Sequence, residues 1–204
     1  MIGRLGVYGG TFDPIHMGHL IVAEMARQEC CLDKVLFIPA KIPPHKNDNH
    51  ISPADYRFEM TGLAIRENPY FDISDLELKR QGISYTVDSI KALSQEQSDE
   101  SKIWLIVGGD SFLEIDSWKD AETIMTMCNF AVYLRPNFPT ETLMIKAERV
   151  RKRFDSNVQF VEAPMIGISS TDIRNRVSRG KSIRYMVPDA VEKYIREKGL
   201  YTAD

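Results

Sequence analysis

The sequence predicts an α/β protein built on a doubly wound parallel sheet. Short apolar runs alternate along the chain with longer segments whose apolar residues recur at helical spacing. Several short runs are nearly unbroken stretches of Val, Ile, Leu, Phe and Tyr, which is typical of strands buried on both faces. Strand, helix and strand repeated in this way indicate parallel strands joined by crossover helices.

The short runs define the expected strands. They are Arg4–Tyr8, Lys34–Pro39, Phe71–Ser74, Lys102–Val107, Phe130–Arg135 and Val158–Glu162. The expected helices are Gly18–Cys31, Pro53–Arg66, Thr86–Gln95, Ala121–Met127, Thr140–Phe154, Ser170–Ser178 and Pro188–Lys198. The last helix carries Val191 and Ile195 on one side and is followed by Gly199, which suits a glycine cap.

Length and composition favour one compact globular domain. The chain has 204 residues, of which 43% are hydrophobic and 27% charged, so a core of useful size is available. We expect a single domain over residues 1–204, with a C-terminal helical part at about 168–204. The formal net charge of −3 gives no broad basic surface, which argues against nucleic acid as the main partner.

The cysteines and the apolar runs indicate where such a protein works. Three cysteines, Cys30, Cys31 and Cys128, are too few and too unevenly placed for a disulfide framework, and we expect free buried thiols at Cys30 and Cys31. No apolar run approaches the length that spans a bilayer, and the N-terminus does not resemble a signal peptide. The sequence therefore predicts a soluble, cytoplasmic protein with no membrane partner.

In doubly wound sheets, ligands bind at the carboxyl ends of the strands. The segment Gly9–His19 follows the first expected strand and opens the first helix. Its two leading glycines let a phosphate approach the backbone, and a helix N-terminus attracts anions. His16 and His19 are three residues apart, so both imidazoles can face the same side and donate hydrogen bonds to phosphate oxygens. Two surface histidines, or two ligands of a metal ion, remain alternatives.

The segment Gly167–Arg174 has the same relation to a strand and a helix near the C-terminus. Its Ser and Thr residues suit an N-cap, so a cap without further function is the alternative. A cap does not require a guanidinium one turn later, and Arg174 is placed to reach a triphosphate bound at the same helix end.

Other polar residues after strands suit a second, phosphorylated substrate. Lys41, His45 and Lys46 lie in a proline-rich loop after the second expected strand and supply positive charge, although a solvated loop is the alternative. Thr86 is a natural N-cap whose backbone N–H can receive a carboxylate. Trp118 can stack on a flat ring or belong to the core.

Asp110 follows the strand Lys102–Val107 and Gly108, where an acidic side chain can accept hydrogen bonds from ribose hydroxyls.

These segments resemble one family. Residues 9–19 read GGTFDPIHMGH, which resembles the signature of nucleotidyltransferases with an HxGH-type loop, a superfamily that includes class I aminoacyl-tRNA synthetases. Residues 168–174, ISSTDIR, resemble the second motif of the same family. The strings PPHK, SYTVD and GGDSF, with a Trp after them, resemble the bacterial nicotinate-nucleotide adenylyltransferases.

The resemblance implies a Rossmann-like nucleotidyltransferase fold and a reaction. The expected reaction transfers the adenylyl group of ATP to nicotinate mononucleotide, giving nicotinate adenine dinucleotide and pyrophosphate for NAD biosynthesis, with Mg²⁺ bound to ATP. The expected catalytic residues are His16, His19 and Arg174. The expected ATP-binding residues are Gly9, Gly10, Thr11, Phe12, Gly18, His19, Gly108, Asp110, Arg135, Ile168, Ser169, Ser170, Thr171 and Arg174. The expected acceptor-binding residues are Lys41, His45, Lys46, Tyr85, Thr86 and Trp118.

Three alternatives stay open at this point. The first is a related transferase that uses nicotinamide mononucleotide, phosphopantetheine or a cytidylyl donor. The second is a non-catalytic nucleotide-binding sensor, and the third is an RNA-binding relative of the synthetases. The sequence leaves the oligomeric state open, a homo-oligomer included.

Overall fold

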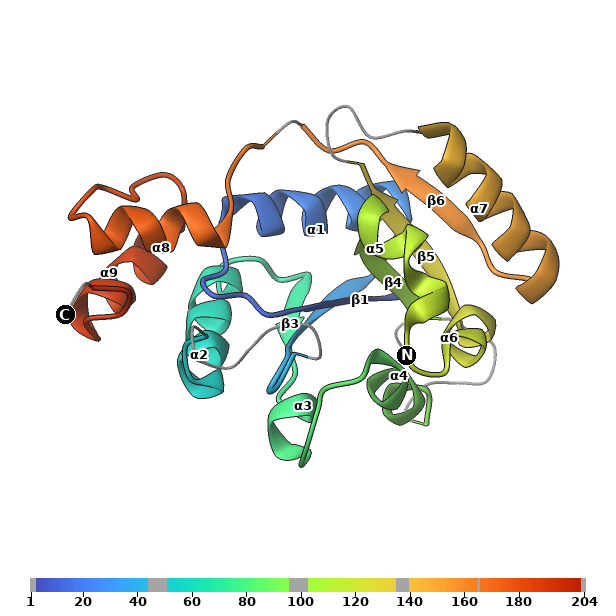
Figure 1. Ribbon diagram of the computed structural model, residues 1–204, viewed down its shortest axis with the longest axis horizontal. Coiled ribbons are helices and arrows are strands. Elements are labelled where there is room, and N and C mark those ends of the chain that lie inside the picture. The colour runs from blue at the N-terminus through green and yellow to red at the C-terminus, as the bar shows by residue number, and fades with distance from the viewer. Residues whose placement is uncertain (1–2, 44–50, 96–102, 135–139, 165, 203–204) are drawn as a thin grey trace. The chain divides into compact units, whose positions relative to one another are not determined.

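The computed structural model describes residues 3–43, 51–95, 103–134, 140–164 and 166–202 (Figure 1). Within these residues six strands form one sheet in the order β3-β2-β1-β4-β5-β6. The strands are β1 (Leu5–Gly10), β2 (Lys34–Pro39), β3 (Phe71–Ile73), β4 (Ile103–Gly108), β5 (Cys128–Tyr133) and β6 (Val158–Val161). The order runs outward from β1 in both directions, which is the doubly wound arrangement. The predicted fold class is confirmed.

The helices also follow the predicted pattern. They are α1 (Met17–Glu29), α2 (Ala54–Ile65), α3 (Leu76–Lys79), α4 (Thr86–Ser94), α5 (Gly109–Leu113), α6 (Ala121–Met127), α7 (Thr140–Phe154), α8 (Ser170–Ser178) and α9 (Asp189–Glu197). The sequence did not predict α3, α5 or the 3₁₀ helix Ile115–Ser117. Each of these is too short to show a helical period.

By its internal contacts the chain divides into two compact units. Unit 1 contains residues Met1–Gly9, Val22–Leu36 and Tyr85–Met165. Unit 2 contains Gly10–Ile21, Phe37–Ser84 and Ile166–Asp204. The single domain expected for residues 1–204 stays a prediction.

Unit 1 is built on parallel strands whose side chains are buried. Residue Gly6 of β1 lies opposite Trp104 of β4, and Ile103 of β4 lies opposite Cys128 of β5. The rings of Phe112 and Phe130 lie 5.3 Å apart between centroids, and neither is exposed. Helix α7 lies along β6 (Figure 1). The core is therefore formed by side chains between the strands and the helices that follow them.

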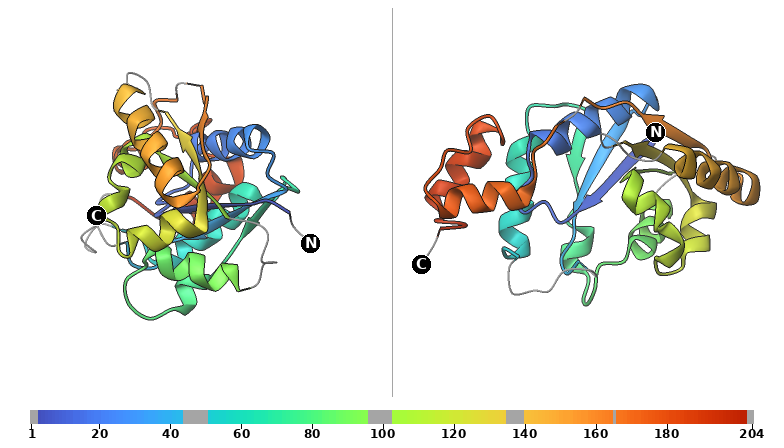
Figure 2. Two further views of the ribbon diagram at one scale, coloured as in Figure 1. Left: turned by 90° about the vertical axis from the view of Figure 1, so that its right-hand side faces the viewer. Right: turned by 45° about the horizontal axis from the view of Figure 1, so that its top comes forward.

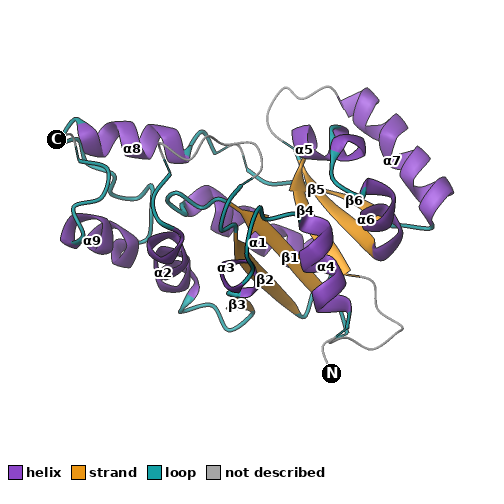
Figure 3. Cartoon of the chain, turned by 60° about the horizontal axis from the view of Figure 1, so that its bottom comes forward, coloured by secondary structure: helices purple, strands orange, loops and turns teal. Residues whose placement is uncertain are grey.

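Unit 2 contains a group of helices that includes α2, α8 and α9 (Figures 2 and 3). Helix α9 buries Val191 and Ile195, four residues apart, and packs against α2, where the rings of Tyr56 and Tyr194 meet edge to face. Gly199 has φ +59° just after α9, which confirms the predicted glycine cap. No helix in the described part of the chain is both long and apolar enough to cross a membrane.

The two cysteines at the end of α1 differ in environment. Cys30 is buried, as expected, but Cys31 is exposed, so the prediction of two buried thiols is wrong for Cys31. Helix α1 ends at Glu29, and Cys31 adopts a left-handed backbone with φ 50° that turns the chain toward β2 and directs this side chain to solvent. Burial, followed by the charge of Glu29, raises the pKa of the Cys30 thiol from 9.0 to about 12.

This difference predicts a pH dependence of stability. The Cys30 thiol stays neutral in the folded protein while the unfolded thiol ionises from pH 9.0, so its contribution is complete below pH 9.0 and is lost as the pH rises toward about 12. In reducing buffer, the free energy of unfolding of the wild type should fall with pH more steeply than that of Cys30→Ala. The difference in slope should approach about 1.4 kcal/mol per pH unit.

Urea titrations at about pH 10 and about pH 11, between the two pKa values, measure these slopes. Cys31→Ala, which removes the exposed thiol, is the matched control and should keep the slope of the wild type. Equal slopes for the wild type and Cys30→Ala would contradict the assignment.

Candidate active site

The first motif lies in unit 2, from Gly10 through the first turn of α1. His16 directly precedes α1, and its backbone N–H donates to Nδ1 of His19 at 3.2 Å. The two imidazole rings are stacked with centroids 3.7 Å apart and planes inclined by 25°. Because the backbone N–H is the donor, Nδ1 of His19 must be an unprotonated acceptor. The proton of neutral His19 therefore resides on Nε2, where it can be donated to an anion.

The glycines of this motif differ in how much space their surroundings leave for a side chain. A Cβ on Gly10 would lie 2.8 Å from the ring of Phe12, and a Cβ on Gly18 would lie 3.1 Å from the ring of His16. The space beside Gly18 is thus taken by the His16 ring. Gly9, which ends the first segment of unit 1, is exposed. A Cβ there would meet nothing within 4 Å. Of the three, Gly9 leaves its backbone open to a phosphate.

Asp13 is the buried carboxylate of the motif, with 2% of its surface exposed. Its Oδ1 accepts a hydrogen bond from the hydroxyl of Tyr201 at 2.6 Å, and its Oδ2 accepts one from the backbone N–H of Ser52 at 3.2 Å. Burial, followed by the charge of Asp13, raises the pKa of Tyr201, so its hydroxyl keeps the proton that it donates. The Asp13 side chain therefore joins the first motif to the C-terminal segment and to the residues before α2.

The second motif meets the first in unit 2. Ser169 caps α8, since its hydroxyl accepts a hydrogen bond from the backbone N–H of Asp172 at 3.1 Å, which confirms the predicted cap. The hydroxyl of Ser170 donates to the carbonyl oxygen of Pro14 at 2.9 Å. One guanidinium nitrogen of Arg174 donates to the carbonyl oxygen of Asp13 at 2.7 Å and lies 3.9 Å from its Oδ2. Residues far apart in the sequence are thereby brought together.

The remaining residues of the second motif flank these contacts. Thr171 accepts a hydrogen bond at 3.4 Å from the other terminal nitrogen of Arg174, and Ile168 is half-buried just before the cap. The Arg174 side chain keeps 26% of its surface exposed. Its orientation is thus fixed from one side while part of the guanidinium can still contact a ligand.

A residue that the sequence did not single out organises the loops of unit 2. The Arg57 side chain of α2 is 1% exposed and donates to three carbonyl oxygens, those of Thr11 at 2.7 Å, Ser52 at 2.9 Å and Lys41 at 3.1 Å. A sequence signal existed, because Arg57 lies on the same face of α2 as the buried residues Met60 and Thr61. No comparable signal marked Tyr201 or Asp13.

Of the three basic residues expected to bind the acceptor phosphate, Lys41 lies within the described residues and is well anchored. Its ammonium donates to the carbonyl oxygen of Arg80 at 3.0 Å, and its backbone N–H donates to the hydroxyl of Ser84 at 3.0 Å. His45 and Lys46 lie outside the described residues.

Tyr85, Thr86 and Trp118, which the resemblance assigns to the acceptor, belong to unit 1. The prediction of a Thr86 cap is wrong, because the N-cap residue of α4 is Tyr85 and Thr86 is already the first helical residue. Lys119 lies over the Tyr85 ring at 4.2 Å and pairs with Asp88 of α4 at 3.4 Å, so the chain next to Trp118 contacts the start of α4. Trp118 itself is half-buried rather than a core residue.

Gly108 and Asp110 also lie in unit 1. Gly108 ends β4, and α5 begins at the next residue without an intervening loop. A Cβ on Gly108 would lie 3.3 Å from the ring of Tyr133, and Asp110 is exposed in the first turn of α5. Arg135 lies outside the described residues.

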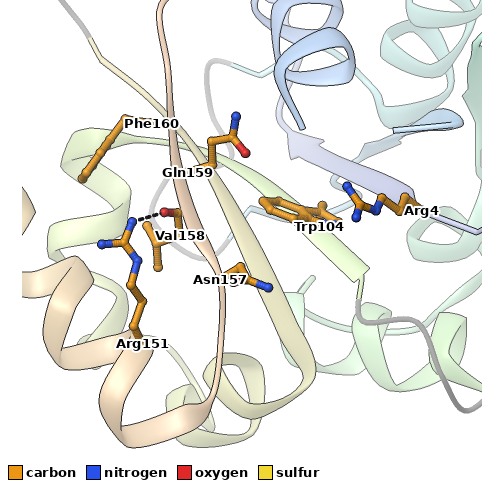
Figure 4. A pocket seen from close by; sticks show the side chains of 7 residues that line it. All are labelled: Arg4, Trp104, Arg151, Asn157, Val158, Gln159 and Phe160. Carbon is orange, nitrogen blue, oxygen red and sulfur yellow. Dashed lines mark hydrogen bonds between the residues drawn. The ribbon is translucent and has the colours of Figure 1, made fainter. Parts of the chain in front are cut away.

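Unit 1 also has a hollow of about 580 Å³ that is unrelated to these residues. It is lined by Arg4, Trp104, Arg151, Asn157, Val158, Gln159 and Phe160 (Figure 4). Figure 4 shows the guanidinium of Arg151 donating to the carbonyl oxygen of Val158. Trp104 is the second residue of β4 and Val158 is the first residue of β6, so the hollow lies at the amino ends of these strands. Ligands of such sheets bind at the carboxyl ends instead.

Comparison with known proteins agrees with the motifs. A family model described as cytidylyltransferase-like matches residues 7–176. A probable nicotinate-nucleotide adenylyltransferase of Moorella thermoacetica is 46% identical over 199 residues, which cover 98% of this chain and 92% of that protein. A protein of Thermus thermophilus with the same description is 41% identical, and the match covers 97% of this chain and 99% of that protein.

Solved structures share the fold at lower identity. The Plasmodium falciparum nicotinic acid mononucleotide adenylyltransferase, complexed with NaAD, superposes with a TM-score of 0.77 at 20% identity over 97% of both chains. A putative nicotinate-nucleotide adenylyltransferase of Vibrio parahaemolyticus gives a TM-score of 0.67 over 100% of this chain and 98% of that one, also at 20% identity. The chain therefore belongs to the cytidylyltransferase-like family and, within it, to the nicotinate-nucleotide adenylyltransferases.

Proposed function

We propose that this protein transfers the adenylyl group of ATP to nicotinate mononucleotide, forming nicotinate adenine dinucleotide and pyrophosphate in NAD biosynthesis. The observation that carries the proposal is the junction of the two motifs in unit 2. There Ser170 and Arg174 of α8 bond to Pro14 and Asp13, next to the stacked pair His16 and His19. Relatives more than 40% identical over nearly the whole chain support the same activity.

The chemistry requires little beyond positioning. A phosphate oxygen of the acceptor, already ionised at neutral pH, attacks the α-phosphorus of ATP. The bond from this phosphorus to the bridging oxygen breaks, and pyrophosphate leaves with the electron pair. No general base is needed, so the protein contributes by aligning the reactants and by compensating the negative charge that develops on the leaving group.

The residues of unit 2 suit the ATP phosphates. His19 donates from Nε2, because its Nδ1 already accepts the backbone N–H of His16. Arg174 supplies a fixed positive charge and further donors from a partly exposed guanidinium. The N-termini of α1 and α8 add backbone N–H groups with a partial positive charge. The His19 donor acts mainly in the transition state, where charge moves onto pyrophosphate.

The residues of unit 1 suit the acceptor ring. The backbone N–H of Thr86 lies in the first turn of α4, where a helix favours a carboxylate. Trp118 is half-buried and offers an aromatic face for stacking. A carboxylated pyridine fits these two features better than a neutral amide does, which favours nicotinate over nicotinamide.

The nucleotide substrate is proposed to be the Mg²⁺ complex of ATP. Mg²⁺ prefers oxygen ligands, whereas the histidine pair offers nitrogen, and both carboxylate oxygens of Asp13 accept hydrogen bonds within the protein. The described residues contain no cluster of three or more His, Cys, Asp or Glu side chains suited to a metal ion. This donor set fits an ion that is held by phosphate oxygens, where it neutralises part of their charge. We place the reaction in the cytoplasm, where ATP is available.

A substrate panel tests the proposed function. Pyrophosphate release from ATP and Mg²⁺ should be fast with nicotinate mononucleotide and much slower with nicotinamide mononucleotide or phosphopantetheine. Preference for another acceptor would contradict the roles of Thr86 and Trp118 but keep the reaction class. No release with any acceptor, while ATP still binds, would favour the non-catalytic sensor.

A matched set of His19 variants tests the proposed donor. His19→Asn places a side-chain oxygen near the position of Nδ1 but has no group at Nε2, while His19→Gln places an amide nitrogen near Nε2. We expect kcat to fall about 10²- to 10³-fold in His19→Ala and His19→Asn, and less in His19→Gln, because one donor to developing charge is worth about that factor.

Steady-state kinetics and calorimetric titration with ATP measure these effects. The Kd for ATP should change less than kcat, since the donor acts mainly in the transition state. Equal losses in His19→Asn and His19→Gln, or a kcat near that of the wild type in His19→Ala, would contradict the role.

A further inference from the structure

The Arg57 guanidinium is buried in unit 2, although no ligand role falls to it. It is 1% exposed, and each of its three nitrogens donates to a different backbone carbonyl, those of Thr11, Lys41 and Ser52. Burying a charge is costly unless hydrogen bonds compensate for the lost water. We therefore ask what the hydrogen bonds of this buried guanidinium do for the three backbone segments that accept them.

The three carbonyls belong to segments that the candidate site uses. Thr11 is part of the first motif, and Lys41 is one of the residues expected to contact the acceptor phosphate. Lys41 and Ser52 flank the segment 42–51, so a single guanidinium holds the backbone on both sides of that segment and ties it to the first motif. One planar group thus sets the backbone positions of Thr11, Lys41 and Ser52 relative to one another.

The Asp13 carboxylate completes this arrangement. Ser52 donates its backbone N–H to Asp13 and gives its carbonyl oxygen to Arg57, so the same residue is held by both buried charges. Burial lowers the pKa of Arg57, and the charge of Asp13 opposes this effect. The guanidinium therefore lies where a nearby negative charge stabilises it.

A lysine could not replace this arrangement. The guanidinium is a rigid plane with five N–H donors, so three acceptors around its edge are fixed relative to each other. An ammonium has three donors at one point on a flexible chain, and it cannot reach three separated carbonyls at about 3 Å from the same position. Arg57→Lys therefore keeps the positive charge but loses the simultaneous hydrogen bonds to the three carbonyls.

We propose that Arg57 is a positioning residue, which fixes Thr11 of the first motif and Lys41 relative to each other so that the phosphate-binding groups next to them are placed productively. This inference rests on the proposed adenylyl transfer. Arg57 does not contact the substrates, and its effect on the reaction is transmitted by the backbones of Thr11, Lys41 and Ser52.

The test compares Arg57→Lys, Arg57→Ala and Arg66→Met with the wild type. Arg66 is exposed at the end of the same helix, so Arg66→Met is the matched control for loss of an arginine from α2. For each protein we would measure kcat, KM for ATP and for nicotinate mononucleotide, and the midpoint of thermal unfolding. Assays run well below that midpoint, so that every variant counted is folded.

The inference predicts a loss of turnover in folded protein. In Arg57→Lys, kcat should fall by up to about 100-fold, the factor expected for misplacement of reacting groups by about 1 Å. In Arg57→Ala, added guanidinium ions at millimolar concentration should restore part of kcat, and methylammonium should not. Arg66→Met should match the wild type in all constants.

Results that contradict the role of Arg57 can be told apart from a result that contradicts the proposed reaction. Wild-type kcat and KM values in folded Arg57→Lys would overturn the inference, even if its unfolding midpoint is lower, because the role would then be stability alone. Failure of Arg57→Lys to fold at any temperature, beside a folded Arg66→Met, would overturn it for the same reason. Absence of turnover in the wild type would refute the proposed function instead.

Discussion

The side chain of Asp13 lies in the interior of unit 2, 2% exposed, and the candidate site depends on how it is stabilised there. A buried carboxylate is tolerated only when hydrogen bonds and positive charge surround it. Its partners come from the C-terminal segment through Tyr201, from the segment before α2 through Ser52, and from α8 through Arg174. Satisfying this one group therefore requires segments from three parts of the chain to converge on the first motif.

This convergence orients the donors of the candidate site through contacts within the protein. The Asp13 carbonyl orients Arg174, the Pro14 carbonyl holds Ser170 at the start of α8, and α1 begins after His16 with its two rings stacked. Preorganised donors need little rearrangement when charge develops on a leaving group, which is how electrostatic stabilisation accelerates phosphoryl and nucleotidyl transfer. The cost of orienting these groups is borne by folding, because their partners are backbone carbonyls rather than mobile side chains.

The sequence predicted most of the fold because buried parallel strands and amphipathic helices leave strong periodic patterns. Helices α6, α7 and α8 were predicted to the residue, whereas α3 and α5 were missed because four or five residues cannot show a period. The cap of α4 was placed one residue late, since Thr86 is a better capping type than Tyr85, yet the backbone turns at Tyr85. The first and last residues of a helix depend on where the backbone turns, and the capping preferences of the amino acids predict those positions poorly.

The sequence singled out the residues expected to bind ligands. It did not single out the residues that hold the loops of the candidate site in position. His16, His19 and Arg174 stand in motifs that carry their own chemistry, and the structure brings them near one another in unit 2. Arg57 and Tyr201 act through partners 46 and 188 residues away, and no local pattern encodes such distances. Positioning residues of this kind become visible only when the burial and the partners of each polar group are known.

We expect His19 to present a protonated Nε2 to the phosphates of ATP, and ¹⁵N NMR of the histidine side chains measures this. Correlations between ring nitrogens and carbon-bound protons distinguish the two tautomers, and a His19→Gln sample assigns the signals. Nδ1 of His19 should be an unprotonated acceptor and Nε2 the protonated nitrogen, with Mg²⁺ and ATP shifting the Nε2 signal more than the Nδ1 signal. A proton on Nδ1 of neutral His19, or signals that do not respond to ATP, would contradict it.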